Sequence, residues 1–145
     1  MTDALVFVTY IKATPEQVWD AITSNEFRRH YFHGSVVETS WDVGSQYRSF
    51  GPAGQLWGDN EILAYDPPRL LAHTWRSLYD PELAAEPSSR VTWTVEVDAA
   101  HPEVTKLTVV HDQLAGSPRT AESVRGWSFI VSGLKTLLET GEPLE

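Results

Sequence analysis

The chain has 145 residues, which is enough for one domain with a sizeable core. Its 20 acidic and 11 basic residues give a formal net charge of −9 with no cluster of lysine and arginine, so nucleic acid and anionic membrane surfaces are poor partners. The lack of cysteine excludes disulfides, thiolate metal sites and a cysteine nucleophile.

The sequence also bears on cellular location and domain count. No apolar run approaches the roughly 18 residues of a membrane span. The N-terminal segment MTDALVFVTY lacks the basic start and long apolar core of a signal peptide. There is no linker, repeat or low-complexity segment. We therefore expect a cytoplasmic protein that forms a single domain over residues 1–145.

The first elements are a strand and two short helices. Residues 4–12 are an apolar strand with both faces partly covered. Thr14-Pro15-Glu16-Gln17 has the pattern of a capping box with proline at the first helical position, and a short amphipathic helix should follow it. A second short helix is predicted over residues 25–31, where two aromatic residues four apart share one face.

The middle of the chain is predicted to be strands separated by turn signals. The strands are expected at residues 36–41, 46–50, 56–65, 70–77, 90–97 and 104–113. Between the last two hairpins, residues 78–89 are rich in Asp, Pro, Glu and Ser, which predicts an exposed and mobile loop.

The chain closes with one long helix. Ser117-Pro118 supplies a start signal and Gly141 a stop signal, and the apolar residues between them recur at spacings of three and four. We predict an unbroken helix that packs on the sheet with this stripe. Gly126 and Gly133 each cost about 1 kcal/mol inside a helix. They therefore indicate either close packing or a ligand-sized space, and both alternatives stay open.

The element order predicts an α+β fold in which a curved antiparallel sheet of about seven strands wraps around the final helix. Alternation within the strands places His73, Trp75, Trp93 and His111 on the face toward that helix. Estimated turn positions put His73 beside Trp93, and Trp75 in the row of His111. Extending the ladder puts Glu61 opposite His73 and Asp59 opposite Trp75, a parity that a bulge would reverse.

These inward residues form a candidate ligand site, because a few polar groups within an aromatic-lined space are typical of small-molecule pockets. The expected ligand-binding residues are Trp57, Asp59, Glu61, His73, Trp75, Trp93, His111, Ile130, Gly133 and Leu134. The expected mouth of the cavity is formed by Phe27, His30, Tyr31 and His33, together with the loop at 78–89. The alternative is that each histidine only satisfies a neighbouring polar group within a filled core.

Catalytic and metal sites are weakly indicated. A Glu61–His73 pair could act as a general acid or base, with His111 as a further candidate, because a carboxylate orients an imidazole and raises its pKa. No serine lies in a nucleophile elbow. His30 and His33 have a spacing that can bind zinc, but no acidic residue follows to complete the site. We expect no metal and no cofactor.

Several segments resemble a known family. They are the opening strand with residues 13–19, Asp66-Pro67-Pro68-Arg69-Leu70-Leu71 leading to Thr74-Trp75, Leu107-Thr108-Val109-Val110-His111, and the closing stretch from Gly126-Trp127 to Gly141. Together they are similar to the activator of Hsp90 ATPase homologue 1-like proteins of the START-like, or SRPBCC, superfamily. The resemblance covers nearly the whole chain and implies the helix-grip (START-like, Bet v 1-like) fold around an interior cavity. It supplies no catalytic residue set.

Members of this superfamily bind lipids, hydrophobic hormones or polyketides, some catalyse cyclisation or hydrolysis, and the eukaryotic namesakes stimulate a chaperone ATPase. The resemblance thus implies that a small hydrophobic or amphipathic molecule binds between sheet and helix. One alternative is a stress-response module of the Hsp90 ATPase activator type that contacts a chaperone or a regulatory partner. Another is an acid-base enzyme, a cyclase or hydrolase, that uses Glu61, His73 or His111. The protein is expected to be a monomer or homodimer.

Overall fold

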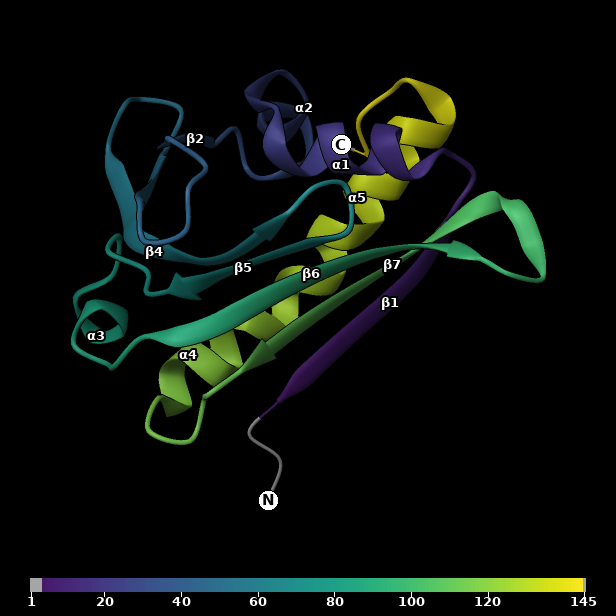
Figure 1. Ribbon diagram of the computed structural model, residues 1–145. Helices are drawn as coiled ribbons and strands as arrows, with labels where there is room; N and C mark the ends of the chain where they lie inside the picture. The colour runs from purple at the N-terminus through teal and green to yellow at the C-terminus, as the bar shows by residue number, and fades with distance from the viewer. Residues whose placement is uncertain (1–3, 145) are drawn as a thin grey trace.

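The computed structural model describes residues 4–144, which form one seven-stranded antiparallel sheet and a set of helices (Figure 1). The strands are β1 (Leu5–Ile11), β2 (Val36–Thr39), β3 (Gln46–Phe50), β4 (Leu56–Asp66), β5 (Leu70–Trp75), β6 (Ser89–Asp98) and β7 (His101–Asp112). The helices are α1 (Pro15–Thr23), α2 (Asn25–Tyr31), α3 (Pro81–Ala84), α4 (Pro118–Ser123) and α5 (Trp127–Thr140), with a 3-10 turn, η1 (Val124–Gly126), between the last two. The predicted helix-grip architecture is confirmed, and α3 is an addition that the sequence did not predict.

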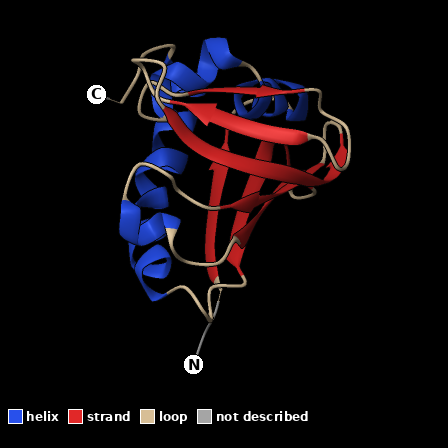
Figure 2. Ribbon diagram, turned by 90° about the vertical axis from the view of Figure 1, so that its left-hand side faces the viewer, coloured by secondary structure: helices blue, strands red, loops and turns tan. Residues whose placement is uncertain are grey.

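The strands follow one another in the sheet in chain order, except that β1 pairs with β7 at the edge. The C-terminal helix runs diagonally across one face of the sheet (Figure 1). The sheet is strongly bent, so that strands at one end run nearly across those at the other (Figure 2). A bent sheet leaves room between its inner face and the helices, and this room holds both the core and the candidate site.

The core lies between the inner face of β5–β7 and the first turns of α5. Trp127 and Leu134 are buried from the helix, and Trp93 and Val109 from the strands. The Trp93 and Trp127 rings lie 5.5 Å apart. Complete burial of side chains of this size stabilises the fold by about 1.5–3 kcal/mol each. The predicted inward faces of β6 and β7 are confirmed at these positions.

The register of two strand pairs differs from the prediction. Ile62, not Glu61, pairs with His73, and the register shifts between Ile62 and Ala64. This bulge reverses the parity of β4, because one extra residue in a strand turns every later side chain to the opposite face. In the next pair, His73 lies opposite Val91 rather than Trp93.

The two short helices are held by local side-chain bonds. The Thr14 hydroxyl accepts a hydrogen bond from Gln17 N at 3.1 Å, and the Gln17 amide oxygen accepts one from Thr14 N at 2.8 Å, which confirms the capping box. At the start of α2, the Asn25 amide makes two hydrogen bonds to the backbone of Val37, at 2.8 and 2.9 Å. This clamp fixes α2 over β2, the last strand of the sheet.

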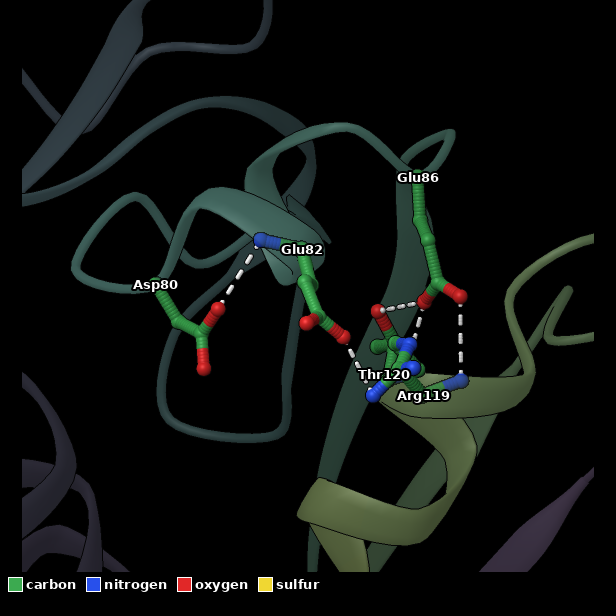
Figure 3. Close-up of polar contacts among 5 residues, drawn as sticks. All are labelled: Asp80, Glu82, Glu86, Arg119 and Thr120. Carbon is green, nitrogen blue, oxygen red and sulfur yellow. Dashed lines mark hydrogen bonds and ion pairs between the residues drawn. The ribbon is translucent and has the colours of Figure 1, made fainter.

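The C-terminal helix is capped by a residue from another part of the chain. The Ser117 side chain makes no capping bond and donates instead to Pro87 O at 3.0 Å. The Glu86 carboxylate accepts from Arg119 N at 3.0 Å and from Thr120 N and Oγ1, both at 2.7 Å (Figure 3). The helix was expected to be unbroken, but it narrows to a 3-10 turn at η1 before α5 continues to Gly141. Within the described chain, no helix has the length and apolar character needed to cross a membrane.

The segment at residues 78–89 was expected to be an exposed loop, but it includes a short helix and is tethered by hydrogen bonds and an ion pair. It contains α3, whose first turn is capped by Asp80 through a 2.8 Å bond from Glu82 N (Figure 3). Leu83 is buried, and Glu82 forms an ion pair with Arg119. Acidic and polar residues that suggest solvent exposure in the sequence are therefore used here as helix caps and tethers.

Candidate functional site

A pocket of about 540 Å³ lies between α2, the bent part of the sheet and the start of the C-terminal helix. We call it the main pocket. Its apolar wall consists of Phe32, Trp57, Trp75, Val124, Trp127 and Ile130, its buried polar groups come from Arg28, Ser35, Ser49 and Ser77, and its rim is formed by His33, Tyr79, Ser123, Gly126 and Phe129. A pocket of this size suits a small organic molecule.

Trp127 is the centre of the apolar wall. It is buried in the first turn of α5, where its ring meets Trp75 edge to face at 5.1 Å and Phe32 edge to face at 5.3 Å. Edge-to-face pairs fix ring orientation because the positive edge of one ring faces the negative face of the other. Contacts within the protein therefore fix the orientation of the three rings.

Arg28 brings a buried positive charge to the main pocket. It lies on α2, is 2% exposed, and its guanidinium carbon sits 4.4 Å from the centre of the Phe32 ring. Its Nη1 donates a long 3.5 Å bond to Ile22 O, and its Nε has no hydrogen-bond partner. It forms no ion pair with any carboxylate of residues 4–144.

Two buried tyrosines lie close enough to Arg28 for its charge to affect their pKa values. Burial raises the pKa of Tyr31 and of Tyr47, and Arg28 only partly opposes this through its charge and a side-chain hydrogen bond to each phenol. The Tyr31 hydroxyl donates to Ala21 O at 2.7 Å. Both phenols are therefore neutral at physiological pH, and neither supplies a negative charge to balance the guanidinium.

His73 lies in the core, stacked on Tyr47 at 4.3 Å, and does not line the main pocket. Its Nε2 accepts a 3.1 Å bond from the Trp93 indole, so its Nδ1 carries the proton and donates to Thr74 O at 2.8 Å. Burial lowers the pKa of His73 to about 3, with the Thr74 carbonyl opposing the shift. A neutral histidine with both nitrogens engaged is suited to structure rather than proton transfer.

His111 lies behind the wall rather than in it. Its ring meets Trp75 at 6.0 Å and Trp127 at 5.7 Å, and its Nε2 lies 2.7 Å from the Ser89 hydroxyl. Burial lowers the pKa of His111 to about 4, against the raising effect of Asp112. Its Nδ1 is buried without a partner. The residue supports the two tryptophans from beneath.

The predicted Glu61–His73 acid-base pair does not form. The β4 bulge turns Asp59 and Glu61 outward, and both residues are exposed on the face of the sheet away from the helices. Asp59 Oδ1 lies 3.7 Å from Arg48 Nε. The Glu61 backbone N–H donates a hydrogen bond to Thr74 Oγ1 at 3.0 Å. Neither carboxylate lines the main pocket.

The other predicted residues divide between pocket and core. Trp57, Trp75 and Ile130 line the main pocket, whereas Trp93 and Leu134 are buried in the core. A Cβ atom added at Gly133 would lie 3.3 Å from Tyr31 Cβ, so this glycine serves close packing of α5 on α2. Gly126 faces open space at the rim of the main pocket.

Of the expected mouth residues, His33 lies at the rim of the main pocket. His30 and Tyr31 line a separate, smaller pocket of about 370 Å³ beside Gly133, which His33 also borders, and Phe27 packs on the core. Among residues 4–144 no group of three or more histidine or acidic side chains is arranged to hold a metal ion.

The sequence reasoning missed the polar lining of the main pocket. Arg28 could have been found from the aromatic residues that follow it, because Tyr31 and Phe32 place its side of α2 inward. Ser35, Ser49 and Ser77 carry no pattern of their own. They are recognised only once the bend of the sheet brings β3 and β4 beside α2.

Solved structures share this fold. Protein MLL2253 from Mesorhizobium loti has a TM-score of 0.74 at 24% identity, over 94% of this chain and 96% of that one. CalU16 from Micromonospora echinospora has a TM-score of 0.71 at 20% identity, over 97% of this chain and 76% of that one. The Aha1 dimer from Colwellia psychrerythraea has a TM-score of 0.71 at 19% identity, over 97% of this chain and 98% of that one. At such identities the likeness concerns the fold.

No curated protein sequence matches the chain. The profile of the family described as "Activator of Hsp90 ATPase homolog 1-like protein" matches residues 12–139, which spans the chain from the end of β1 to the last turn of α5. The chain therefore belongs to the activator of Hsp90 ATPase homolog 1-like family.

Proposed function

We propose that the protein binds a small amphipathic molecule in the main pocket. The observation that carries this proposal is an aromatic wall of Trp75, Trp127 and Phe32 beside a few buried polar groups. Apolar contact supplies most of the affinity in such sites, and the polar groups orient the ligand.

The first test is to compare native and denatured mass spectra of the protein purified from cells. A small molecule that is present only in the native spectrum supports the proposal and identifies the ligand. A bare mass is then followed by titration with N-phenyl-1-naphthylamine, an uncharged fluorescent probe of apolar pockets. Failure of both experiments would contradict ligand binding.

A variant links such binding to the main pocket. Val124 lines it and is 1% exposed, so Val124→Phe adds a ring where the ligand would lie. We expect the affinity for the probe to fall by at least about tenfold. The matched control is Ser128→Phe, because Ser128 is exposed in α5 and does not line the pocket. Equal affinity of Val124→Phe and wild type would place the probe elsewhere.

A second candidate function is protein contact through the outer face of β1. Val6, Val8 and Tyr10 are 59%, 49% and 48% exposed there, in a strand at the edge of the sheet. Exposed apolar rows on edge strands favour association with another chain. A second copy of this chain or a chaperone are the partners to test, by sedimentation velocity and by ATPase stimulation. A monomer that leaves the ATPase rate unchanged would remove this candidate.

A further inference from the structure

The buried guanidinium of Arg28 lacks a counter-charge, and this bears on the chemistry of the ligand. Removing a charged group from water is costly unless an opposite charge or several hydrogen bonds offset it. Arg28 has one long bond to a carbonyl, a stacking contact with Phe32 and an unpartnered Nε. Its other polar neighbours are the hydroxyls of Tyr31 and Tyr47, which can accept hydrogen bonds from the guanidinium but carry no negative charge.

The surrounding protein offers no anion to this group. The lining of the main pocket contains no aspartate or glutamate. The neighbouring tyrosines Tyr31 and Tyr47 are neutral because burial raises the pKa of each. The formal charge of the whole chain is −9, yet the charged side chain turned into this pocket is a cation.

Hydroxyl groups gather on the same pocket. Ser35 is 2% exposed and its Oγ has no hydrogen-bond partner. Ser49 and Ser77 are buried residues that also line the pocket. A guanidinium with nearby hydroxyl donors is suited to the oxygens of a carboxylate, because charge-assisted hydrogen bonds are shorter and stronger than neutral ones.

We propose that the ligand is an apolar carboxylic acid whose carboxylate pairs with Arg28 and whose body lies against Trp75 and Trp127. This inference rests on the proposed function and specifies the ligand class. Aliphatic and aromatic acids share this chemistry. The aromatic wall accepts either body, so the head group rather than the body is the common requirement.

The test compares head groups on constant bodies by isothermal titration calorimetry. The aliphatic probes are decanoate, decanol and decylamine, and the aromatic probes are 2-naphthoate, 2-naphthalenemethanol and 2-naphthalenemethylamine. In the wild-type protein we expect at least one acid to bind about tenfold or more tightly than its alcohol, and each amine to bind more weakly than its acid. The series whose acid binds more tightly shows whether the body of the ligand is aliphatic or aromatic.

Variants assign the preference to Arg28. Arg28→Gln should bring the affinity for the acid down to that for the alcohol, with the alcohol unchanged. Arg29→Gln is the matched control, because it makes the same charge change at the next residue of α2, where the side chain is exposed and outside the main pocket. It should retain the wild-type preference.

The outcomes separate the two proposals. Acids that bind no better than alcohols to the wild-type protein overturn the head-group assignment, while ligand binding stands. A preference that persists in folded Arg28→Gln also overturns it. If that variant does not fold, the wild-type comparison together with Arg28→Lys decides, since lysine keeps the charge but loses the planar fork. Absence of binding by both acids overturns the head-group assignment, whereas ligand binding itself is decided by the mass spectra and the uncharged fluorescent probe.

Discussion

The two glycines of the C-terminal helix should respond differently to the same substitution. Gly126 has ordinary right-handed dihedrals of φ −69° and ψ −6°, and an added Cβ would meet no atom within 4 Å. At Gly133 the added Cβ would lie 3.3 Å from Tyr31 Cβ and 3.7 Å from Tyr31 O. A methyl group therefore finds space at one position and a packed neighbouring helix at the other.

These geometries give the magnitudes. Gly126→Ala should stabilise the fold by about 0.4–1 kcal/mol, because alanine restricts the unfolded chain without strain in the native state. Gly133→Ala gains about 1 kcal/mol of helix propensity. It loses about 1–3 kcal/mol from overpacking, because α2 must move. The net effect ranges from none to a loss of about 2 kcal/mol, so the two variants should differ by at least about 0.4 kcal/mol.

The assay is urea unfolding followed by tryptophan fluorescence, with circular dichroism as a second probe of the same transition. Wild type, both single variants and the double variant are compared. The sites contact different surroundings, so their effects should add. Equal stabilisation by Gly126→Ala and Gly133→Ala would refute the close approach of α5 to α2.

Three further outcomes follow from buried and capping groups. Trp93→Phe removes the indole donor from His73 Nε2 and should cost about 1–3 kcal/mol of unfolding free energy, measured in urea, whereas a loss below about 0.5 kcal/mol would contradict a required bond. Burial lowers the pKa of His73 from 6.5 to about 3, so the histidine binds a proton more readily in the unfolded chain than in the folded protein. Folding stability that is present above pH 6.5 is therefore lost progressively as the pH falls toward 3. This group alone should remove about 2 kcal/mol by pH 5, and an NMR titration that shows His73 protonated at pH 5 in the folded protein would exclude that account. Burial opposes the ionisation of Glu86, but the hydrogen bonds from Thr120 and Arg119 and the Arg119 charge together lower its pKa below 4.5. The contribution of Glu86 to folding stability is therefore present above pH 4.5 and is lost as the pH falls through the lower pKa of the folded state. Glu86→Gln should therefore melt below wild type at pH 7 and approach it in acid, and a pH-independent difference would show that the charge is unimportant.

The predictions from sequence succeeded where one periodic pattern governs a whole element. Strands β6 and β7 alternate cleanly, so the burial of Trp93, Val109 and His111 followed from parity. The capping box at Thr14 and the stop at Gly141 are local signals, and both are present in the structure. The antiparallel α+β architecture followed from the order of these elements.

The candidate site was harder to predict because it depends on irregular features. A single bulge in β4 moved Asp59 and Glu61 to the outer face, and nothing in the alternation marks where the extra residue falls. Arg28 was missed because a charged residue on a short helix is normally expected to face solvent. The two alternatives left open for the helix glycines both occur, since Gly126 borders the pocket while Gly133 packs against α2.

The pairing of β1 with β7 has a consequence for how the chain acquires its structure. Leu5 lies opposite His111, so the first strand has no partner until about three quarters of the 145-residue chain has been synthesised. Such distant contacts make folding slow, because loop-closure entropy is lost before the pairing compensates it. A nascent chain that ends before β7 should leave β1 unpaired and vulnerable to proteases, with the complete chain gaining protection only when β7 and α5 are both available.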